Sequence, residues 1–236
     1  MLIKEAMGVF WQTLKDTWEE LYMLAIVNLV WLFAWGAPLG IAAAIKSEVA
    51  IGIGTVLAVL IFPVVSVGVY ACTDRVSRGK TFNFSDFRAG ISEYWWKAIL
   101  WMLINVVVIG LILLNLWFYS VNFQGTWVVI VGGVWIAILA LWITAQVYYW
   151  PMMMHQTETK LLLGFRNAFF LLLSNPFYAF FMVSFAVIFA ALSIGLTLPL
   201  IFVGMGLQGL LGCNAVVRLL ISYDKIEDPR PKPTAN

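Results

Sequence analysis

The sequence has few charged residues for its length. Only 11% of its 236 residues are Asp, Glu, Lys or Arg, against about 25% in a typical soluble domain. Hydrophobic residues make up 63%, so the chain has too little polar surface to cover a globule. Lipid must therefore form part of its solvent, and we expect an integral membrane protein. The small net charge of +2 also provides no basic face for nucleic acid.

Cysteine and histidine are scarce too, which excludes the usual metal sites. Cys72 and Cys213 are too few and too far apart for a disulfide framework or a zinc site, so we interpret them as reduced packing residues. His155 is the only histidine, and Glu158 is its only acidic neighbour nearby in the sequence. We interpret it as an interfacial residue near the end of a membrane span. No metal and no cofactor are expected.

Two short motifs resemble catalytic or nucleotide-binding sequences but lack the other residues that such sites need. Gly-Lys-Thr at 79–81 lacks the glycine that a phosphate-binding loop needs five residues before its Gly-Lys pair, because Asp74 stands there. Ser77 and Lys80 have the spacing of a serine–lysine nucleophile, but the usual partners of that pair are missing. We therefore expect a protein that is not an enzyme.

Long apolar runs dominate the chain instead. A membrane helix needs about 20 mostly apolar residues, and six segments qualify, at roughly 21–45, 49–72, 98–119, 127–151, 177–198 and 199–221. The last two are nearly continuous, so a turn is expected between Gly195 and Pro199, and a re-entrant pair is the alternative to two full spans. The predicted fold class is all-α: a polytopic membrane helix bundle of three hairpins. Residues 1–222 form a single membrane domain, and residues 223–236 form a flexible cytoplasmic tail.

Basic residues fall almost entirely on one side of these spans. Of the 14 Lys and Arg residues, only Lys46 lies in a connection on the other side. Basic residues resist translocation and stay in the cytoplasm. The pattern predicts a protein of the cell membrane (inner or plasma membrane) with both termini in the cytoplasm.

A short amphipathic helix is expected before each hairpin, lying in the cytoplasmic interface with its apolar face toward lipid. Apolar residues recur at spacings of three and four at Ile3, Met7, Phe10, Leu14, Trp18 and Leu21, and again at Phe84, Phe87, Ile91 and Trp95. Matches at a constant offset pair Val69-Tyr70 with Val147-Tyr148, and Phe87-Arg88 with Phe165-Arg166. We interpret them as a threefold repeat of one such helix and one hairpin, packed around an axis normal to the membrane.

The segment 73–97 is the first candidate functional site. It gathers five basic residues beside an aromatic run and paired tryptophans: Arg75, Arg78, Lys80, Arg88 and Lys97. Their charge marks the cytoplasmic side of the membrane. The same charge suits anionic lipid headgroups or a docking protein partner.

Deep polar residues are the second candidate. Asn28, Asn105 and Gln146 form a possible path for a neutral solute, and hydrogen bonding between helices is the alternative role. No Asp, Glu, Lys or His falls in the middle of a span, which disfavours a proton-coupled carrier. Glycines at helical spacing are expected to allow close helix packing, namely Gly36 and Gly40, and Gly206, Gly209 and Gly212.

Residues 20–120 resemble the YesL-like bacterial membrane proteins. The resemblance rests on "NLVWL" in the first span, "FPVVSVGVYA" at 62–71 and "FSDFRAGISEYWWKAILWMLI" after the basic segment. The matching positions are Asn28, Trp31, Pro63, Val64, Val65, Ser66, Gly68, Phe84 and Phe87.

The resemblance implies an accessory membrane role in bacterial carbohydrate uptake, with a transporter subunit as a possible partner. The alternative function is a small permease for a neutral solute. One departure affects the topology: about thirty residues separate Trp31 from Pro63, more than the family has. Either the first hairpin is longer here or Pro63 lies inside a span.

Overall fold

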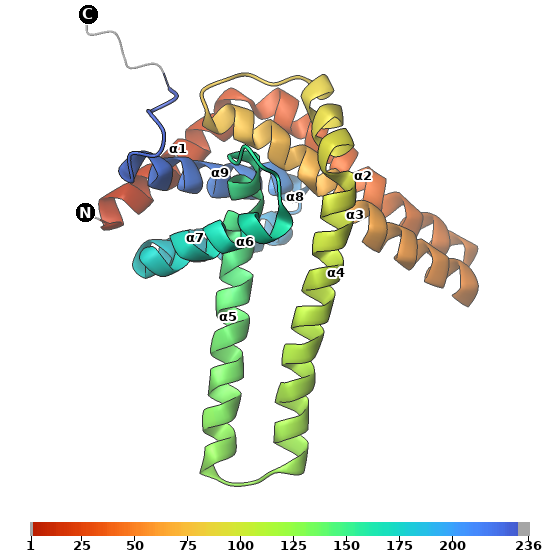
Figure 1. Ribbon diagram of the computed structural model, residues 1–236. Coiled ribbons are helices and arrows are strands. Elements are labelled where there is room, and N and C mark those ends of the chain that lie inside the picture. Colours follow the sequence, from red (N-terminus) through yellow and green to blue (C-terminus); the bar gives the residue numbers. More distant parts are fainter. Residues whose placement is uncertain (1, 231–236) are drawn as a thin grey trace, which may run out of the picture.

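The computed structural model describes residues 2–230, and Figure 1 shows their path. They form the helices α1 (Leu2–Glu19), α2 (Leu21–Ile45), α3 (Glu48–Ser77), α4 (Phe84–Asn122), α5 (Thr126–Met154), α6 (Leu161–Ser174), α7 (Pro176–Leu196), α8 (Leu198–Phe202) and α9 (Gly204–Ser222). Six of these are long and apolar enough to cross a membrane: α2, α3, α4, α5, α7 and α9. They pair into three hairpins, so the predicted all-α class is confirmed. The chain is a multi-pass membrane protein.

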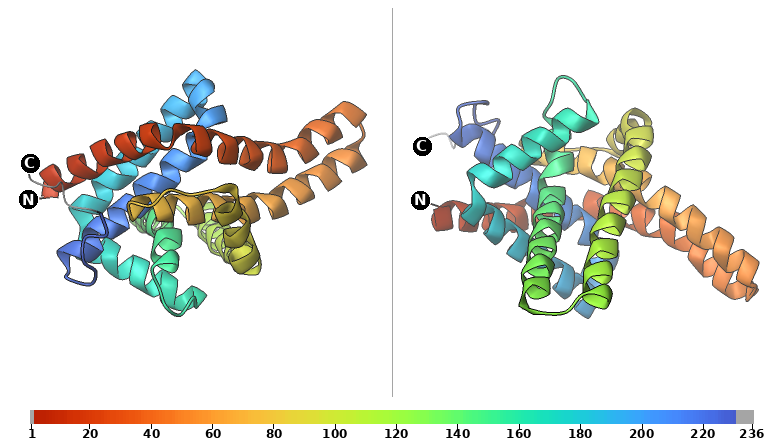
Figure 2. Two further views of the ribbon diagram at one scale, coloured as in Figure 1. Left: turned by 90° about the horizontal axis from the view of Figure 1, so that it is seen from above. Right: turned by 60° about the horizontal axis from the view of Figure 1, so that its bottom comes forward.

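The three hairpins meet at one end and spread apart at the other. In Figure 1 the tip of α2–α3 points to the right and the tip of α4–α5 points down. Seen from above, in the left view of Figure 2, the tip of α7–α9 points in a third direction, toward the top of the picture. The hairpins point in three directions, so the structure differs from the expected packing around one axis normal to the membrane. Away from the region where the hairpins meet, α4 and α5 are uncovered, with 11% and 6% of their most apolar stretches buried.

Helix α9 is the centre of this meeting region. In its most apolar stretch 78% of the residues are buried, and α1, α3, α5 and α7 pack on it. Gly206, Gly209 and Gly212 follow each other along α9 and face α2, α3 and α5 in that order. A Cβ on Gly212 would lie 2.6 Å from the carbonyl oxygen of Val147, so the close approach requires glycine. This predicted packing role is confirmed, and we call α9 with the parts of α1, α3, α5 and α7 packed on it the hub.

The other predicted glycine pair does not serve close packing within the chain, so that prediction was wrong, and association with a second copy stays the alternative. Side chains built on Gly36 and Gly40 would meet nothing within 4 Å. Gly54 of α3 makes the close approach instead, since a Cβ there would lie 2.6 Å from the carbonyl oxygen of Pro38 in α2. Pro63 lies inside α3, which settles the alternative left by the sequence.

Two helix boundaries differ from expectation. The amphipathic helix expected around Phe84–Trp95 is not separate, because it continues into the span as one helix of 39 residues with no proline to break it. At about 1.5 Å per residue this helix is about 58 Å long, nearly twice the roughly 30 Å hydrocarbon layer. In the last hairpin the turn comes at Thr197, as predicted, with a positive φ of 59°. The short helix α8 then intervenes, so the sixth span begins at Gly204 instead of residue 199.

Candidate functional site at the hub

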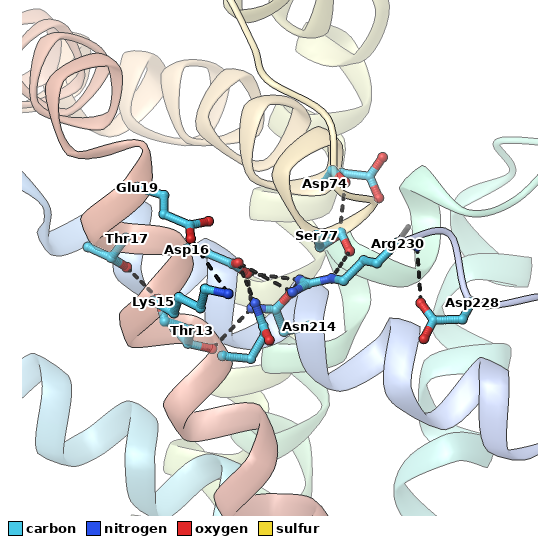
Figure 3. A network of polar contacts seen from close by, with 11 residues as sticks. Thr13, Lys15, Asp16, Thr17, Glu19, Asp74, Ser77, Asn214, Asp228 and Arg230 are labelled. Atoms are coloured by element: carbon cyan, nitrogen blue, oxygen red, sulfur yellow. Dashed lines mark hydrogen bonds and ion pairs between the residues drawn. The ribbon is translucent and has the colours of Figure 1, made fainter. Parts of the chain in front are cut away.

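The described end of the C-terminal tail folds back onto the hub, as Figure 3 shows. The Arg230 guanidinium binds both oxygens of Asp16, with Nη1 donating to Oδ1 at 3.3 Å and Nη2 donating to Oδ2 at 2.9 Å. Nη2 also donates to Asn214 Oδ1 at 2.8 Å, and Nε donates to the carbonyl oxygen of Ser77 at 3.2 Å. Arg230 therefore joins α1, α3 and α9. We call Asp16, Asn214 and Arg230 the tail lock.

The buried carboxylate of Asp16 is the reason why the tail is bound at Arg230. Its side chain is only 6% exposed, and a buried carboxylate is tolerated only when it is paired and hydrogen-bonded. Asn214 Nδ2 donates to Asp16 Oδ2 at 2.9 Å, and Gln12 Nε2 donates to Oδ1 at 2.7 Å. The expected flexible tail from residue 223 thus differs from the structure, in which the chain is anchored at Arg230. Residues 231–236 of that predicted tail lie outside the described part of the chain.

A second polar cluster joins the ends of α3 and α5. Arg78 Nε lies 2.9 Å from Asp74 Oδ2, and His155 Nδ1 lies 3.1 Å from Asp74 Oδ1. Arg78 Nη2 also donates to the carbonyl oxygen of Met154 at 3.0 Å. His155 lies at the end of α5, as expected for a residue near the end of a span, but its side chain is buried and its carboxylate partner is Asp74 instead of Glu158.

The protonation of His155 follows from this burial. Loss of solvent lowers the pKa of the imidazole below its ordinary value of 6.5, and the adjacent Asp74 carboxylate opposes this only in part. His155 Nδ1 also lies 3.0 Å from the carbonyl oxygen of Pro151, which accepts a hydrogen bond when Nδ1 carries the proton. The folded protein therefore favours neutral His155.

Three of the five basic residues predicted to dock a partner make polar contacts within the chain, and of these three only Arg75 is exposed. Arg75 Nε lies 3.3 Å from Asp86 Oδ2, across the α3–α4 connection. Arg78 belongs to the Asp74 cluster described above. Lys97 is buried, donates to Thr159 Oγ1 and lies over the ring of Tyr94, 4.9 Å from its centroid.

The remaining two, Lys80 and Arg88, are exposed beside exposed aromatic side chains. Phe84, Arg88 and Trp95 recur at helical spacing, so they share one side of α4, and the exposed Trp96 flanks this side. We call Lys80, Phe84, Arg88, Trp95 and Trp96 the basic-aromatic face. Only part of the predicted docking segment thus forms a surface.

Asn28, predicted as a path residue, instead satisfies the chain break between α8 and α9. Its Nδ2 donates to the carbonyl oxygens of Leu200 and Ile201, each at 2.8 Å. Its Oδ1 accepts the backbone N–H of Met205 at 2.8 Å. A break in a helix leaves backbone groups that lipid cannot satisfy, so this amide stabilises the turn of the last hairpin.

Asn105 and Gln146 join α4 to α5 through two tryptophans. Trp142 Nε1 donates to Asn105 Oδ1 at 2.9 Å, and Trp101 Nε1 donates to Gln146 Oε1 at 3.0 Å. Each amide nitrogen also donates to a backbone carbonyl of its own helix. The three predicted path residues therefore serve two separate joints between helices, as the alternative role required.

Two grooves open at the hub. One, of about 520 Å³, lies between α1, α9 and the tail beside the tail lock. The other, of about 410 Å³, lies between α5, α6, α9 and the tail, with His155 on its wall. Within residues 2–230, no group of three or more His, Cys, Asp or Glu side chains is placed to hold a metal ion. Cys72 and Cys213 are buried free thiols, as predicted.

Comparison of the chain with protein-family models, with curated proteins and with solved structures found no match. The function is therefore inferred from the geometry of the hub and of α4, together with the resemblance of residues 20–120 described above.

Sequence reasoning missed both buried acids of the hub, Asp16 and Asp74. Asp16 had a detectable signal, because it continues a stripe of small residues on α1 formed by Ala6, Val9 and Thr13 at helical spacing. Such a stripe indicates a packed face, and an acid on a packed face needs a cation. Asp74 had a local signal in Arg78, four residues later, but its second partner His155 lies on a different hairpin and could not be predicted from spacing.

Proposed function

We propose that this multi-pass membrane protein is a non-enzymatic accessory or scaffold component that binds a partner protein through the basic-aromatic face of α4. The observation that carries the proposal is the contrast within one segment. Lys80 and Arg88 are exposed beside three exposed aromatic residues and make no ion pair within residues 2–230, whereas Arg78 and Lys97 are held by internal contacts and Arg75, although 44% exposed, pairs with Asp86. Arginine and large aromatic side chains are enriched where proteins bind one another.

The side of the membrane and the class of partner come from the sequence. In the predicted topology all but one of the 14 basic residues are on the side that carries this face, and this bias supports a cytoplasmic location. The resemblance to YesL-like proteins supports a subunit of a carbohydrate transporter as the partner. Both are parts of the proposal.

The alternative, a small permease for a neutral solute, has less support. The side-chain amides of Asn28, Asn105 and Gln146 are engaged in hydrogen bonds at two different joints. A transport path through them would have to break contacts that hold the helices together.

The test is a mild-detergent pull-down of the tagged protein from its native membranes. The variant carries Lys80→Glu and Arg88→Glu, which reverse the exposed charges and leave the internal ion pairs intact. Lys46→Glu, at the tip of α2–α3, is the matched control on the opposite side.

We expect one membrane or cytoplasmic partner to copurify near-stoichiometrically with the wild type and the control, and to be lost from the double variant. Recovery of the wild-type protein alone would contradict the proposal. Equal recovery of a partner with the double variant would show that the basic-aromatic face is not the docking site.

A further inference from the structure

The groove beside the tail lock has the form of a binding site. Polar and charged residues from three segments line it: Lys4, Glu5 and Gln12 of α1, Asn214 and Arg218 of α9, and Asp228 and Arg230 of the tail. Its volume of about 520 Å³ lies in the range of sites for small ligands. Asn214 and Arg230 are fixed by the tail lock, so this part of the wall is rigid.

The charged groups of the groove are not equally available to a ligand. Glu5 Oε1 lies 3.5 Å from Arg218 Nη2, and the Glu5 side chain is only 19% exposed. Asp228 Oδ1 accepts the backbone N–H of Arg230 at 3.1 Å. Lys4 is exposed, and the Arg218 side chain remains 48% exposed despite its ion pair. The wall formed by α1 and α9 therefore presents the two cations Lys4 and Arg218, while the tail contributes the exposed Asp228 carboxylate to the opposite part of the lining. A ligand with a negatively charged group fits the part formed by α1 and α9.

The surroundings of the groove are those of a membrane surface. Trp11 and Trp18 on the outer side of α1 are 64% and 78% exposed, and tryptophan is enriched at the level of lipid headgroups. Apolar side chains line part of the same groove: Val9, Val217 and Ile221. A ligand that is charged at one end and apolar at the other satisfies both parts of the lining.

We propose that this groove binds the headgroup of an anionic phospholipid. Lys4 and Arg218 contact the phosphate, which suits charge-assisted hydrogen bonds, and the apolar lining contacts the first methylenes of the acyl chains. Gly8 faces the open space of the groove, since a Cβ at this position would meet nothing within 4 Å. A free phosphate is the other source of the same chemistry, and the experiment separates the two.

The experiment uses the full chain purified in a neutral detergent, with bound lipid counted by native mass spectrometry during titration. The probes are dioctanoyl phosphatidylglycerol, dioctanoyl phosphatidylcholine and inorganic phosphate. We expect saturable binding of phosphatidylglycerol at least ten times tighter than that of phosphatidylcholine, and no competition by phosphate. Lys4→Gln should weaken binding about fivefold, the loss expected for one surface cation.

Gly8→Leu fills the groove without changing a charge, and Gly40→Leu is its matched control, since both glycines face open space. Gly8→Leu should abolish phosphatidylglycerol binding while Gly40→Leu preserves it. Unchanged binding by a folded Gly8→Leu variant would overturn the proposal. Full competition by inorganic phosphate would overturn the lipid assignment. If Gly8→Leu does not fold, unchanged affinity of Lys4→Gln overturns the proposal.

Discussion

Replacing Arg230 by Met should release the tail and destabilise the hub. Met has a similar size, but it removes the charge that neutralises Asp16 and four hydrogen bonds to Asp16, Asn214 and the carbonyl oxygen of Ser77. The Asp16 carboxylate then remains in a site where its side chain is 6% exposed. A buried carboxylate that has lost its cation is the main cause of the expected loss.

The size of the expected loss in the free energy of unfolding follows from the solvent exposure of the Asp16 and Arg230 side chains. Removing one partner of a fully buried ion pair costs about 3–5 kcal/mol. The Arg230 side chain is 24% exposed, so water can partly replace it, and we expect a loss of about 2–3 kcal/mol. For a chain of this length that corresponds to a fall of roughly 5–10 °C in the unfolding temperature.

Two measurements check this prediction. Thermal unfolding in detergent, followed by tryptophan fluorescence, reports the hub, and trypsin cleavage after the exposed Lys225 reports release of the tail. Arg230→Lys keeps the charge but loses the bidentate contact with Asp16. Its unfolding temperature should lie between those of the wild type and Arg230→Met. Asp16→Asn combined with Arg230→Met should recover part of the loss, because no buried charge is left without a partner.

The reasoning is refuted if Arg230→Met unfolds within about 1 °C of the wild type and is cleaved at the same rate. A loss of stability that Asp16→Asn leaves unchanged would mean that the tail is held by something other than the buried carboxylate.

Three further outcomes are expected, each measured by thermal unfolding of the purified protein. Asn28→Leu should lower the free energy of unfolding by about 2–4 kcal/mol, because two carbonyl groups and one N–H at the α8–α9 break lose their partner. An unchanged unfolding temperature would show that water or lipid satisfies these backbone groups. Gly212→Ala should cost at least 1–3 kcal/mol by pushing α9 from the Val147 carbonyl, whereas Gly36→Ala, which meets open space, should be nearly neutral. Stability should fall as the pH is lowered below about 6.5, because unfolded His155 binds a proton there while the folded imidazole, with its lowered pKa, stays neutral. His155→Gln should flatten this part of the profile, and an identical slope in both proteins would contradict the assignment, since His155 is the only histidine.

The six spans could be predicted because lipid imposes a simple rule on sequence. A segment that crosses the membrane must be long, apolar and helical, and each expected span overlaps one of the six long apolar helices of the structure. The spacing of the glycines in the sequence could not show which of them allow close packing between helices. Gly206 and its neighbours face other helices, whereas Gly36 and Gly40 have the same kind of pattern on a side that meets nothing.

The functional residues were harder to predict because their partners are distant in sequence. Arg230 lies 214 residues from Asp16, and local periodicity carries no information about such a pair. The basic segment was predicted as one surface from charge alone. The fold divides it, because Arg78 and Lys97 reach groups on α5 and beyond it while Lys80 and Arg88 stay at the surface.

The most direct test of the account is the side of the membrane on which the basic-aromatic face lies. Single cysteines at Lys46, Gln124 and Thr197, near the three hairpin tips, and at Lys80 would be labelled on intact cells with a membrane-impermeant maleimide. The native Cys72 and Cys213 are buried and stay in place. The account predicts labelling of the three tips from outside, and labelling of the Lys80 position only after the membrane is opened. Labelling of the Lys80 position from outside, or on the same side as Gln124, would contradict it.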